Sequence, residues 1–270
     1  MNDVIERTRG LPATVESLTA DLVALGVERG MVLIAHTSLS SLGWVCGGPV
    51  AVIAALEQAL GPEGTLVMPT FSGDLSDPAT WKNPPVPEDW WETIRETTPP
   101  YDVRLSPTRG VGLVPETFIR RPGVRRSAHP LVSFTAWGAE AARITDAHAL
   151  DFGFGTQSPL ARVYDLEGSV LLLGVGHAAN TSLHLGEYRA LYPGCPVVQN
   201  GAPVLAAGVR KWVTIQDIDV DDSDFEVLGA DYEQGGGLVR RGCVACAEAQ
   251  LIPQRSLVDY ATHWIAEHRG

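Results

Sequence analysis

The sequence predicts an α/β fold built on a parallel sheet, and three observations support this. Over the first seventy residues, helical patterns alternate with short apolar runs typical of buried strands. The chain of 270 residues is 45% hydrophobic, enough for one large core. Only 19% of residues are charged, which is low for a disordered chain. We therefore expect a single domain over residues 1–270.

The first seventy residues read as helix, strand, helix and strand. The first helix follows Thr14, a typical N-cap, and ends before Gly26. Its apolar residues recur at spacings of three and four. The next three elements are a strand at 31–36, a helix at 48–60 with Pro49 in its first turn, and a strand at 64–71.

Residues 72–110 interrupt this alternation. The segment is rich in proline and contains Trp81, Trp90 and Trp91, so it is too long for a connector and too aromatic for a solvated linker. We predict a functional excursion. The pattern beyond it predicts helices at 110–123, 139–150, 158–166, 181–192 and 256–268, strands at 129–138 and 169–176, and antiparallel strands within 203–219.

Composition excludes several classes of function. A net charge of −12 argues against nucleic-acid and anionic-membrane partners, since both need a basic face. No apolar run approaches the ~18–20 residues that span a bilayer, and no signal peptide is visible, so we expect a cytoplasmic protein. Cys243 and Cys246 form a single C-x-x-C, which lacks the second pair of a structural zinc site. We expect both to be buried small hydrophobic residues.

The stretch 170–187 allows three interpretations. Gly174 and Gly176 follow a strand, but a dinucleotide fingerprint would need a third glycine where Ala179 stands and a carboxylate about twenty residues on. His177 and His184 are seven residues apart and no H-E-x-x-H is present, so we expect no metal.

The third interpretation is acid–base chemistry. His184 lies near the start of a predicted helix, and Glu187, one turn on, could hold its imidazole. Asn180 and Thr181 suit an N-cap, and the Thr181 hydroxyl could also reach a ligand oxygen. The alternative is a histidine that fills a polar cavity.

Two stretches favour an anionic ligand. Residues 34–48 lead from a strand through serine and threonine into a helix, where unpaired N–H groups suit phosphates, although no Walker motif is present. Arginines gather at 104–109 and 120–126, which suits a polyphosphate cofactor. The alternatives are a capped polar turn and a solvated charged face.

An amine-bearing, sugar-like ligand is favoured by the excursion, because carboxylates stand there among aromatic side chains. The alternative is a set of solvated loop carboxylates. The residues are Asp74, Asp77, Trp81, Glu88, Asp89, Trp90, Trp91, Glu92, Tyr101 and Asp102.

Taken together, these stretches resemble the aminoglycoside 3-N-acetyltransferase family. The matching segments are 36–43 (HTSLSSLG), 67–72 (VMPTFS), 74–81 (DLSDPATW), 110–138 and 155–187, the last ending in NTSLHLGE. The resemblance implies acetyl transfer from acetyl-CoA to the 3-amino group of the deoxystreptamine ring of an aminoglycoside. It also implies a three-layer α/β/α sandwich around a largely parallel mixed sheet, with the antiparallel strands in the C-terminal portion.

The resemblance also implies roles for individual residues. His184 and Glu187 would be the catalytic pair, and His129 a further family histidine. In the mechanism that we expect, Thr181 or a backbone N–H donates to the oxyanion, and Glu187 or a nearby aspartate orients the imidazole. The remaining implied contacts are His36, Thr37, Ser38, Leu39, Ser106, Thr108 and Arg109 with CoA, and Asp74, Trp81, Trp91, Tyr101, Asp102 and Glu187 with the substrate.

We expect direct transfer, with His184 as general base, in a monomer or homodimer without a metal. An acyl-carrying Cys46 or Cys195 is less favoured, because neither stands beside an obvious base in sequence. The rival from another class is a non-catalytic CoA- or sugar-binding protein of the same fold, and a further alternative is an enzyme acting on other amines.

Overall fold

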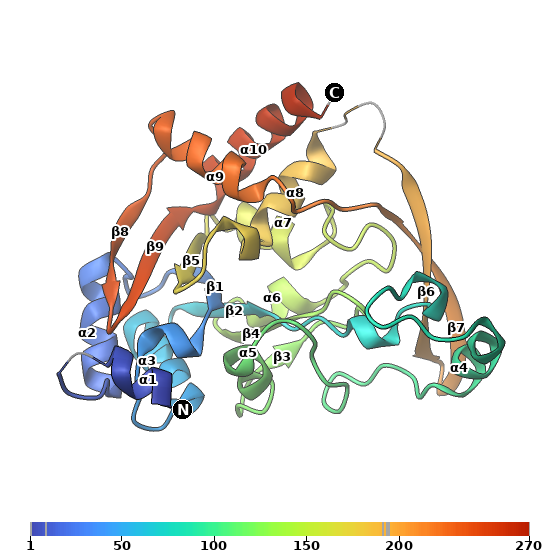
Figure 1. Cartoon of the computed structure of the whole chain (residues 1–270), viewed down its shortest axis with the longest axis horizontal. Helices are drawn as coiled ribbons and strands as arrows, with labels where there is room; N and C mark the ends of the chain where they lie inside the picture. The colour runs from blue at the N-terminus through green and yellow to red at the C-terminus, as the bar shows by residue number, and fades with distance from the viewer. Residues whose placement is uncertain (1, 9, 191, 193–194, 270) are drawn as a thin grey trace.

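A seven-stranded sheet forms the centre of the protein, and helices cover both of its faces (Figure 1). The computed structural model describes residues 2–8, 10–190, 192 and 195–269. The strands are β1 (Val32–Thr37), β2 (Thr65–Pro69), β3 (Arg125–Arg126), β4 (Phe134–Gly138), β5 (Ser169–Leu173), β8 (Arg240–Val244) and β9 (Ala247–Pro253). Their order is β3-β4-β2-β1-β5-β9-β8, so the predicted three-layer α/β/α architecture is confirmed.

The sheet is mixed, and its parallel part is small. β1 pairs in parallel with β2 on one side and β5 on the other. Every other pairing in this sheet is antiparallel, because β4 returns beside β2 and the hairpin β8–β9 adds to β5. The expected description "largely parallel" therefore holds only for the three central strands.

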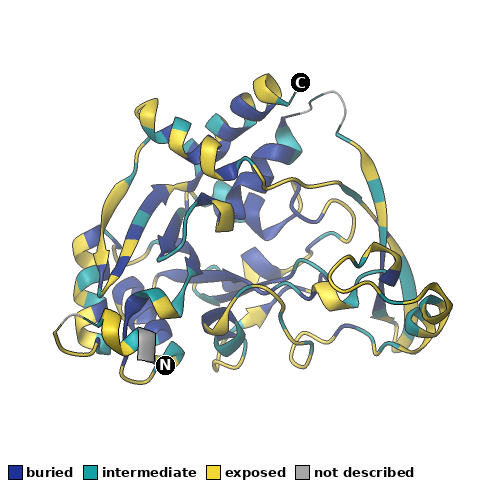
Figure 2. Cartoon of the chain, in the orientation of Figure 1, coloured by how far each residue is buried: buried dark blue, intermediate teal, exposed yellow. Residues whose placement is uncertain are grey.

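Alternating side chains of the central strands fill two cores, as the period of two requires. Leu33 and Ala35 belong to one core, and Ile34 to the other. The first core lies against α2 (Val15–Leu25), α3 (Pro49–Leu60) and α5 (Leu113–Phe118). The second lies against α6 (Ala141–Thr145), α7 (Pro159–Asp165), α8 (Ser182–Arg189), α9 (Phe225–Gln234) and α10 (Gln254–His268). Figure 2 shows the resulting buried centre.

Helix signals in the sequence are confirmed where capping chemistry is strong. Thr14 caps α2 in a reciprocal box with Ser17, and Gly26 ends the helix at φ 110°, a left-handed conformation that favours glycine. Most of the remaining predicted helices and strands form with shorter or slightly shifted bounds, while α10 and β6 begin earlier than predicted. The prediction missed α1 (Asn2–Arg7), α4 (Trp91–Thr97), α9, β3, β8 and β9.

The excursion 72–110 contains one short helix, α4 (Trp91–Thr97), and packs on a separate hairpin. This hairpin, β6 (Val197–Ala206) with β7 (Val209–Ile218), confirms the antiparallel strands expected there. Backbone contacts join the two segments: Tyr101 N donates to Pro203 O (2.8 Å), and Arg210 Nε donates to Thr98 O (2.8 Å). Excursion and hairpin lie together at the right of Figure 1. Within the described ranges, no helix has the length and apolar character needed to cross a bilayer.

Candidate active site at the edge of the parallel strands

A cleft of about 570 Å³ lies beyond the carboxyl ends of β1, β2 and β5. Open α/β sheets bind ligands in this position, because loops from neighbouring parallel strands converge there. The loop after β1, the segment 109–115 and residues 178–181 after β5 line it, with the first turn of α9. The topology thus brings together four stretches that are far apart in sequence.

His184, in the first turn of α8, lines this cleft. Its Nδ1 lies 2.9 Å from Glu187 Oε2, and its ring stacks on Phe154 at 4.9 Å with an interplanar angle of 6°. Since an ionised carboxylate only accepts, this hydrogen bond places a proton on Nδ1, and in the neutral imidazole Nε2 then carries the lone pair. In the described structure Nε2 has no hydrogen-bond partner, so a basic nitrogen is directed to the cleft.

Glu187 is fully buried, and its carboxylate is saturated with donors. Beyond the contact with His184, Oε1 accepts from Arg269 Nη1 (2.6 Å) and from the backbone N of Asp221 (2.9 Å). A buried carboxylate is tolerated when its charge and its lone pairs are compensated in this way. The His184–Glu187 pair is therefore held rigidly from one side.

His36, at the end of β1, faces the same cleft from the other side. Burial, together with the nearby His184, lowers its pKa to about 3, so this imidazole is neutral near pH 7. Thr181 Oγ1 lies 3.4 Å from His36 Nε2. Thr181 also lines the cleft, so its hydroxyl lies beside His36 in the same site that holds His184. Thr37 also lines the cleft, but its Oγ1 is buried and has no hydrogen-bond partner within the described ranges.

The structure brings most of the expected CoA-binding residues to the cleft, but not all. His36, Thr37, Ser38, Leu39 and Arg109 line it. Ser106 and Thr108 are absent from its lining, because local contacts take up their hydroxyls. Ser106 Oγ accepts from Asp102 N (2.9 Å), and Thr108 Oγ1 bonds to Glu116.

The expected substrate-binding residues divide in the same way. Asp74 and Trp81 line an adjoining cavity of about 330 Å³ that shares Arg109 with the cleft, and Asp74 forms an ion pair with Arg109.

Trp91, Tyr101 and Asp102 line neither cavity. Trp91 lies on α4 below the Arg95 guanidinium. Buried Tyr101 donates to Ser127 O (2.9 Å), and Asp102 Oδ1 accepts from the backbone N of Arg104 (2.7 Å). The structure therefore gives these three side chains contacts within the fold.

His129 is buried away from the cleft. Its Nδ1 accepts from the backbone N of Leu131 (3.1 Å) and Val132 (3.0 Å), and its Nε2 donates to Leu150 O (3.0 Å). Burial lowers its pKa to about 4. Because both nitrogens serve the backbone, no proton-accepting atom remains for a substrate.

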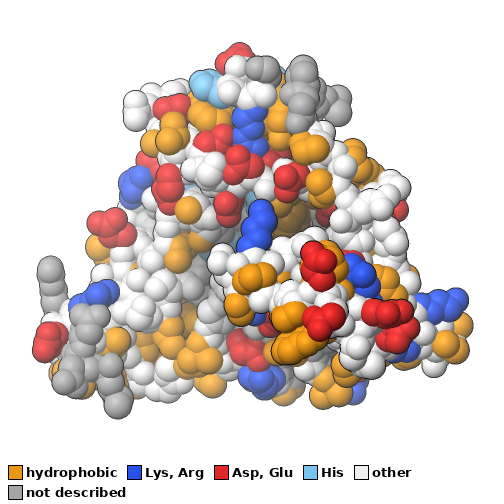
Figure 3. All heavy atoms as spheres, turned by 45° about the vertical axis from the view of Figure 1, so that its right-hand side comes forward, with side chains coloured by type: hydrophobic (Ala, Val, Ile, Leu, Met, Phe, Trp, Pro, Cys, Tyr) orange, Lys and Arg blue, Asp and Glu red, His pale blue; other side chains and the backbone are white. Residues whose placement is uncertain are grey.

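Three residues of the site were missed by sequence reasoning. Asp222 and Phe225 line the cleft, and Arg269 holds Glu187 from behind. Asp222 and Phe225 lie within the acidic run 217–226 (DIDVDDSDFE), which could have indicated a binding site for a cationic ligand. No local sequence pattern around Arg269 indicated that it would contact Glu187. Figure 3 shows acidic side chains around the hollow near the middle of the molecule.

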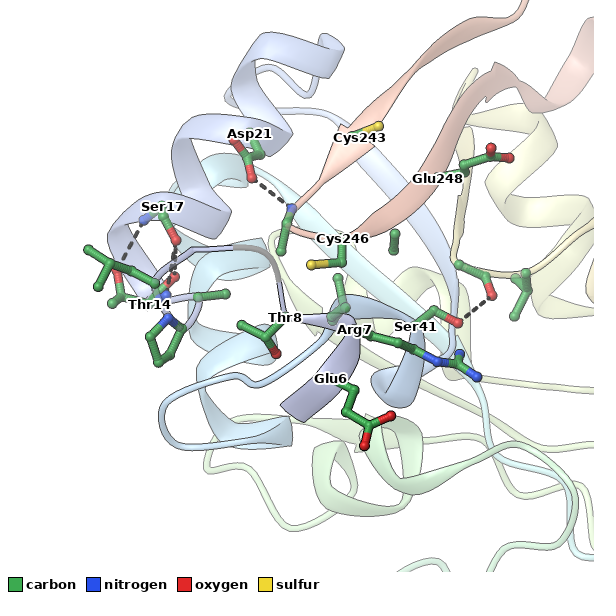
Figure 4. A pocket seen from close by; sticks show the side chains of 18 of the residues that line it. Glu6, Arg7, Thr8, Thr14, Ser17, Asp21, Ser41, Cys243, Cys246 and Glu248 are labelled. Carbon is green, nitrogen blue, oxygen red and sulfur yellow. Dashed lines mark hydrogen bonds between the residues drawn. The ribbon is translucent and has the colours of Figure 1, made fainter. Parts of the chain in front are cut away.

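A larger cavity, of about 1290 Å³, lies between α1, the start of α2 and the hairpin β8–β9 (Figure 4). Cys243 and Cys246 line it, and both are exposed, which corrects the expectation of buried thiols. The reason is their position, since β8 is an edge strand and Cys246 lies in the hairpin turn. Their sulfur atoms point in different directions. Among the residues that the structure describes, no three His, Cys, Asp or Glu side chains form a group able to hold a metal.

Comparison with known proteins assigns the chain to a family. The model of the family described as aminoglycoside 3-N-acetyltransferase matches residues 34–266. The chain belongs to this family. It is accordingly an N-acetyltransferase, and the resemblance stated from sequence is confirmed.

Individual relatives agree with the family assignment. The SPbeta prophage-derived aminoglycoside N(3')-acetyltransferase-like protein YokD of Bacillus subtilis is 43% identical over 98% of this chain and 96% of its own. Its crystal structure superposes with a TM-score of 0.96 over 100% and 98% of the two chains, at 42% identity. A structure described as AAC-IIIb binary with CoASH has a TM-score of 0.85 at 31% identity, covering 95% and 97%. Sisomicin-bound AAC-VIa has a TM-score of 0.85 at 29% identity, covering 95% and 99%.

Proposed function

We propose that this protein transfers the acetyl group of acetyl-CoA directly to the 3-amino group of the 2-deoxystreptamine ring of aminoglycosides, with His184 as general base. The observation that carries the proposal is the His184–Glu187 pair, whose free Nε2 opens on a cleft. The whole of residues 1–270 would act as one domain of the family, with 72–110 as a substrate-binding excursion.

The co-substrate assignment draws on the relative whose structure is described as a complex with CoASH. In this chain the loop 36–39 and Arg109 would meet the pantetheine arm and phosphates, since they line the cleft. No metal is needed for this chemistry.

In the proposed step, His184 Nε2 accepts a proton from the substrate nitrogen as that nitrogen attacks the thioester carbonyl. The carbon–sulfur bond then breaks, and the CoA thiolate leaves and takes up the proton held by His184, which returns the imidazole to its neutral form. The Thr181 hydroxyl would donate to the oxyanion, a contribution typically of about 3–4 kcal/mol per donor. Glu187 holds the imidazole in the tautomer that the step requires.

Direct transfer is supported by where the thiols lie. Neither Cys46 nor Cys195, the two residues considered as acyl carriers, lines the cleft that holds His184. A covalent intermediate on either thiol would require the acetyl group to leave the vicinity of the base. The proposal therefore contains a single transfer without an acyl-enzyme.

The substrate class draws on relatives described as bound to sisomicin and to a gentamicin. In this chain Asp222 lines the cleft, Asp74 and Trp81 line the adjoining cavity, and the net charge is −12. Carboxylates beside an aromatic wall suit a polycationic amino sugar. We propose further that the protein acts in the cytoplasm, as a monomer or homodimer, without nucleic-acid or membrane partners.

The test is release of free thiol from acetyl-CoA with a panel of aminoglycosides and of unrelated amines. Turnover with aminoglycosides, and a product acetylated at the 3-amino group by NMR, is the expected result. Turnover confined to other amines would support the other-amine alternative, and CoA binding without any turnover would support a non-catalytic protein.

A further inference from the structure

Arg269 lies one residue before the C-terminus and at the back of the catalytic pair. Its Nη1 donates to Glu187 Oε1 (2.6 Å), its Nε to Asp224 Oδ2 (2.8 Å) and its Nη2 to Asp221 O (2.6 Å). Only 11% of the side chain is exposed. In Figure 1 the end of α10 lies beside α8, the helix that carries His184 and Glu187.

These contacts link two parts of the active site. Glu187 also accepts from the backbone N of Asp221, so the loop that follows β7 is tied both to the carboxylate and to Arg269. This loop presents Asp222 and Phe225 to the cleft. A single guanidinium therefore fixes the partner of His184 and the loop beside the substrate.

The charge on Arg269 compensates a buried carboxylate. Burial lowers the pKa of Arg269, but its hydrogen bonds to Asp224, Tyr192 and Glu187 outweigh burial and raise it overall, so the cation persists. Other titratable groups face the pair from every element packed against it. They are His36 on β1, Asp217 on β7, Tyr188 on α8, Tyr192 beyond α8, and Asp221, Asp222 and Asp224 before α9.

We propose that Arg269 is a positioning residue for acetyl transfer, which acts through Glu187 to set the orientation and basicity of His184. This inference rests on the proposed function, in which His184 is the general base of acetyl transfer. Arg269 does not line the cleft, so it touches no substrate. Its bonds to both Glu187 and Asp224 require a planar fork, which lysine cannot reproduce.

The first experiment needs no turnover. The His184 imidazole is titrated by 15N–1H NMR in the wild type, R269A, R269Q and R269K, with R255A as control. Arg255 lies on α10, the helix that Arg269 follows, but it pairs with exposed Glu167. With the positive charge gone, Glu187 stabilises the imidazolium more strongly, so His184 should titrate about one pH unit higher in R269A and R269Q. R269K keeps the positive charge, although it lacks the planar fork, and R255A leaves the pair untouched. In both variants His184 should therefore titrate like the wild type.

Kinetics supply the second readout. R269A should lower kcat by about 10- to 100-fold while the KM for acetyl-CoA stays within about twofold, and the acid limb of kcat/KM should move to higher pH. In an E187Q background, R269A should add less than about threefold, because the two residues act in series.

The outcomes separate the two proposals. A folded R269A or R269Q whose His184 titrates as in the wild type overturns the role of Arg269, whatever the substrate. If R269A fails to fold, R269Q retains an amide donor for Glu187 and answers the same question. Absence of acetylation in the wild type would instead refute the proposed function, while the NMR titration still decides the role of Arg269.

Discussion

Two pairs of buried histidines lie in this protein, and only one of them opens on a cavity. His36 and His184 line the cleft at the edge of the parallel strands. His129 and His148 stack at 4.8 Å inside the fold, where each ring bonds to a backbone carbonyl. Burial lowers the pKa of His36, His129 and His148 alike.

The difference lies in which nitrogen remains free. His148 uses Nδ1 on Ser127 Oγ (3.0 Å) and Nε2 on Gly153 O (2.7 Å), and His129 is saturated in the same way. His184 uses only Nδ1, which leaves Nε2 toward the cleft. A shifted pKa by itself therefore does not distinguish a catalytic histidine from one that braces a loop; unused hydrogen-bonding capacity beside a cavity does.

Replacing each histidine in turn should separate the two pairs most strongly. H184A should lower kcat by about 10²- to 10⁴-fold, the usual contribution of a general base. It should also lower stability to some extent, because it removes one donor from buried Glu187, which keeps its bonds to Arg269 and to the backbone N of Asp221. H129A should leave three backbone groups unpaired and lower the free energy of unfolding by about 2–4 kcal/mol, while the folded fraction keeps its kcat. Steady-state kinetics and urea titration measure the two effects. Equal loss of kcat in both variants would remove the distinction.

A smaller effect is expected for Thr181, whose hydroxyl lies beside His36 in the cleft. T181V keeps the shape of the side chain and removes its donor, so kcat should fall by about 10²-fold while both KM values change little. Thr145, buried on α6 and bonded to its own helix, offers a matched control in T145V. A rise in KM without a change in kcat would show that Thr181 binds the ground state instead.

Acid should destabilise the protein through His129 and His148. Both pKa values fall below the unfolded value of about 6.5, to about 4 for His129 and about 3 for His148, so the unfolded chain binds more protons between these limits. The stability that these two neutral histidines contribute is fully present above pH 6.5, and it is lost as the pH falls toward 4. We expect a loss of about 2 kcal/mol between pH 7 and pH 5 from His129 alone. Urea titrations at the two pH values should show a smaller drop in H129A, and an equal drop would contradict this assignment.

How far the sequence could predict these two regions depends on the range of the interactions. Thr14 and Gly26 specify the ends of α2 by themselves, and His184 and Glu187 are one turn apart, so both were predictable. Family resemblance and local spacing could not show that His129 faces backbone groups of residues 131, 132 and 150. Arg269 is 82 residues from Glu187, and only the packing of α10 on α8 brings them together.

The smallest expected effect concerns the loop that Arg269 holds. Asp222 lines the cleft, where a polycationic substrate would meet it. D222N should raise the KM for the aminoglycoside by about three- to tenfold and leave kcat nearly unchanged, because a partly solvated charge contributes about 1 kcal/mol. D89N, on the exposed part of the excursion, is the matched control. The KM difference should shrink as salt rises, since screening weakens the attraction; a salt-independent difference would mean that Asp222 shapes the loop and does not attract the amine.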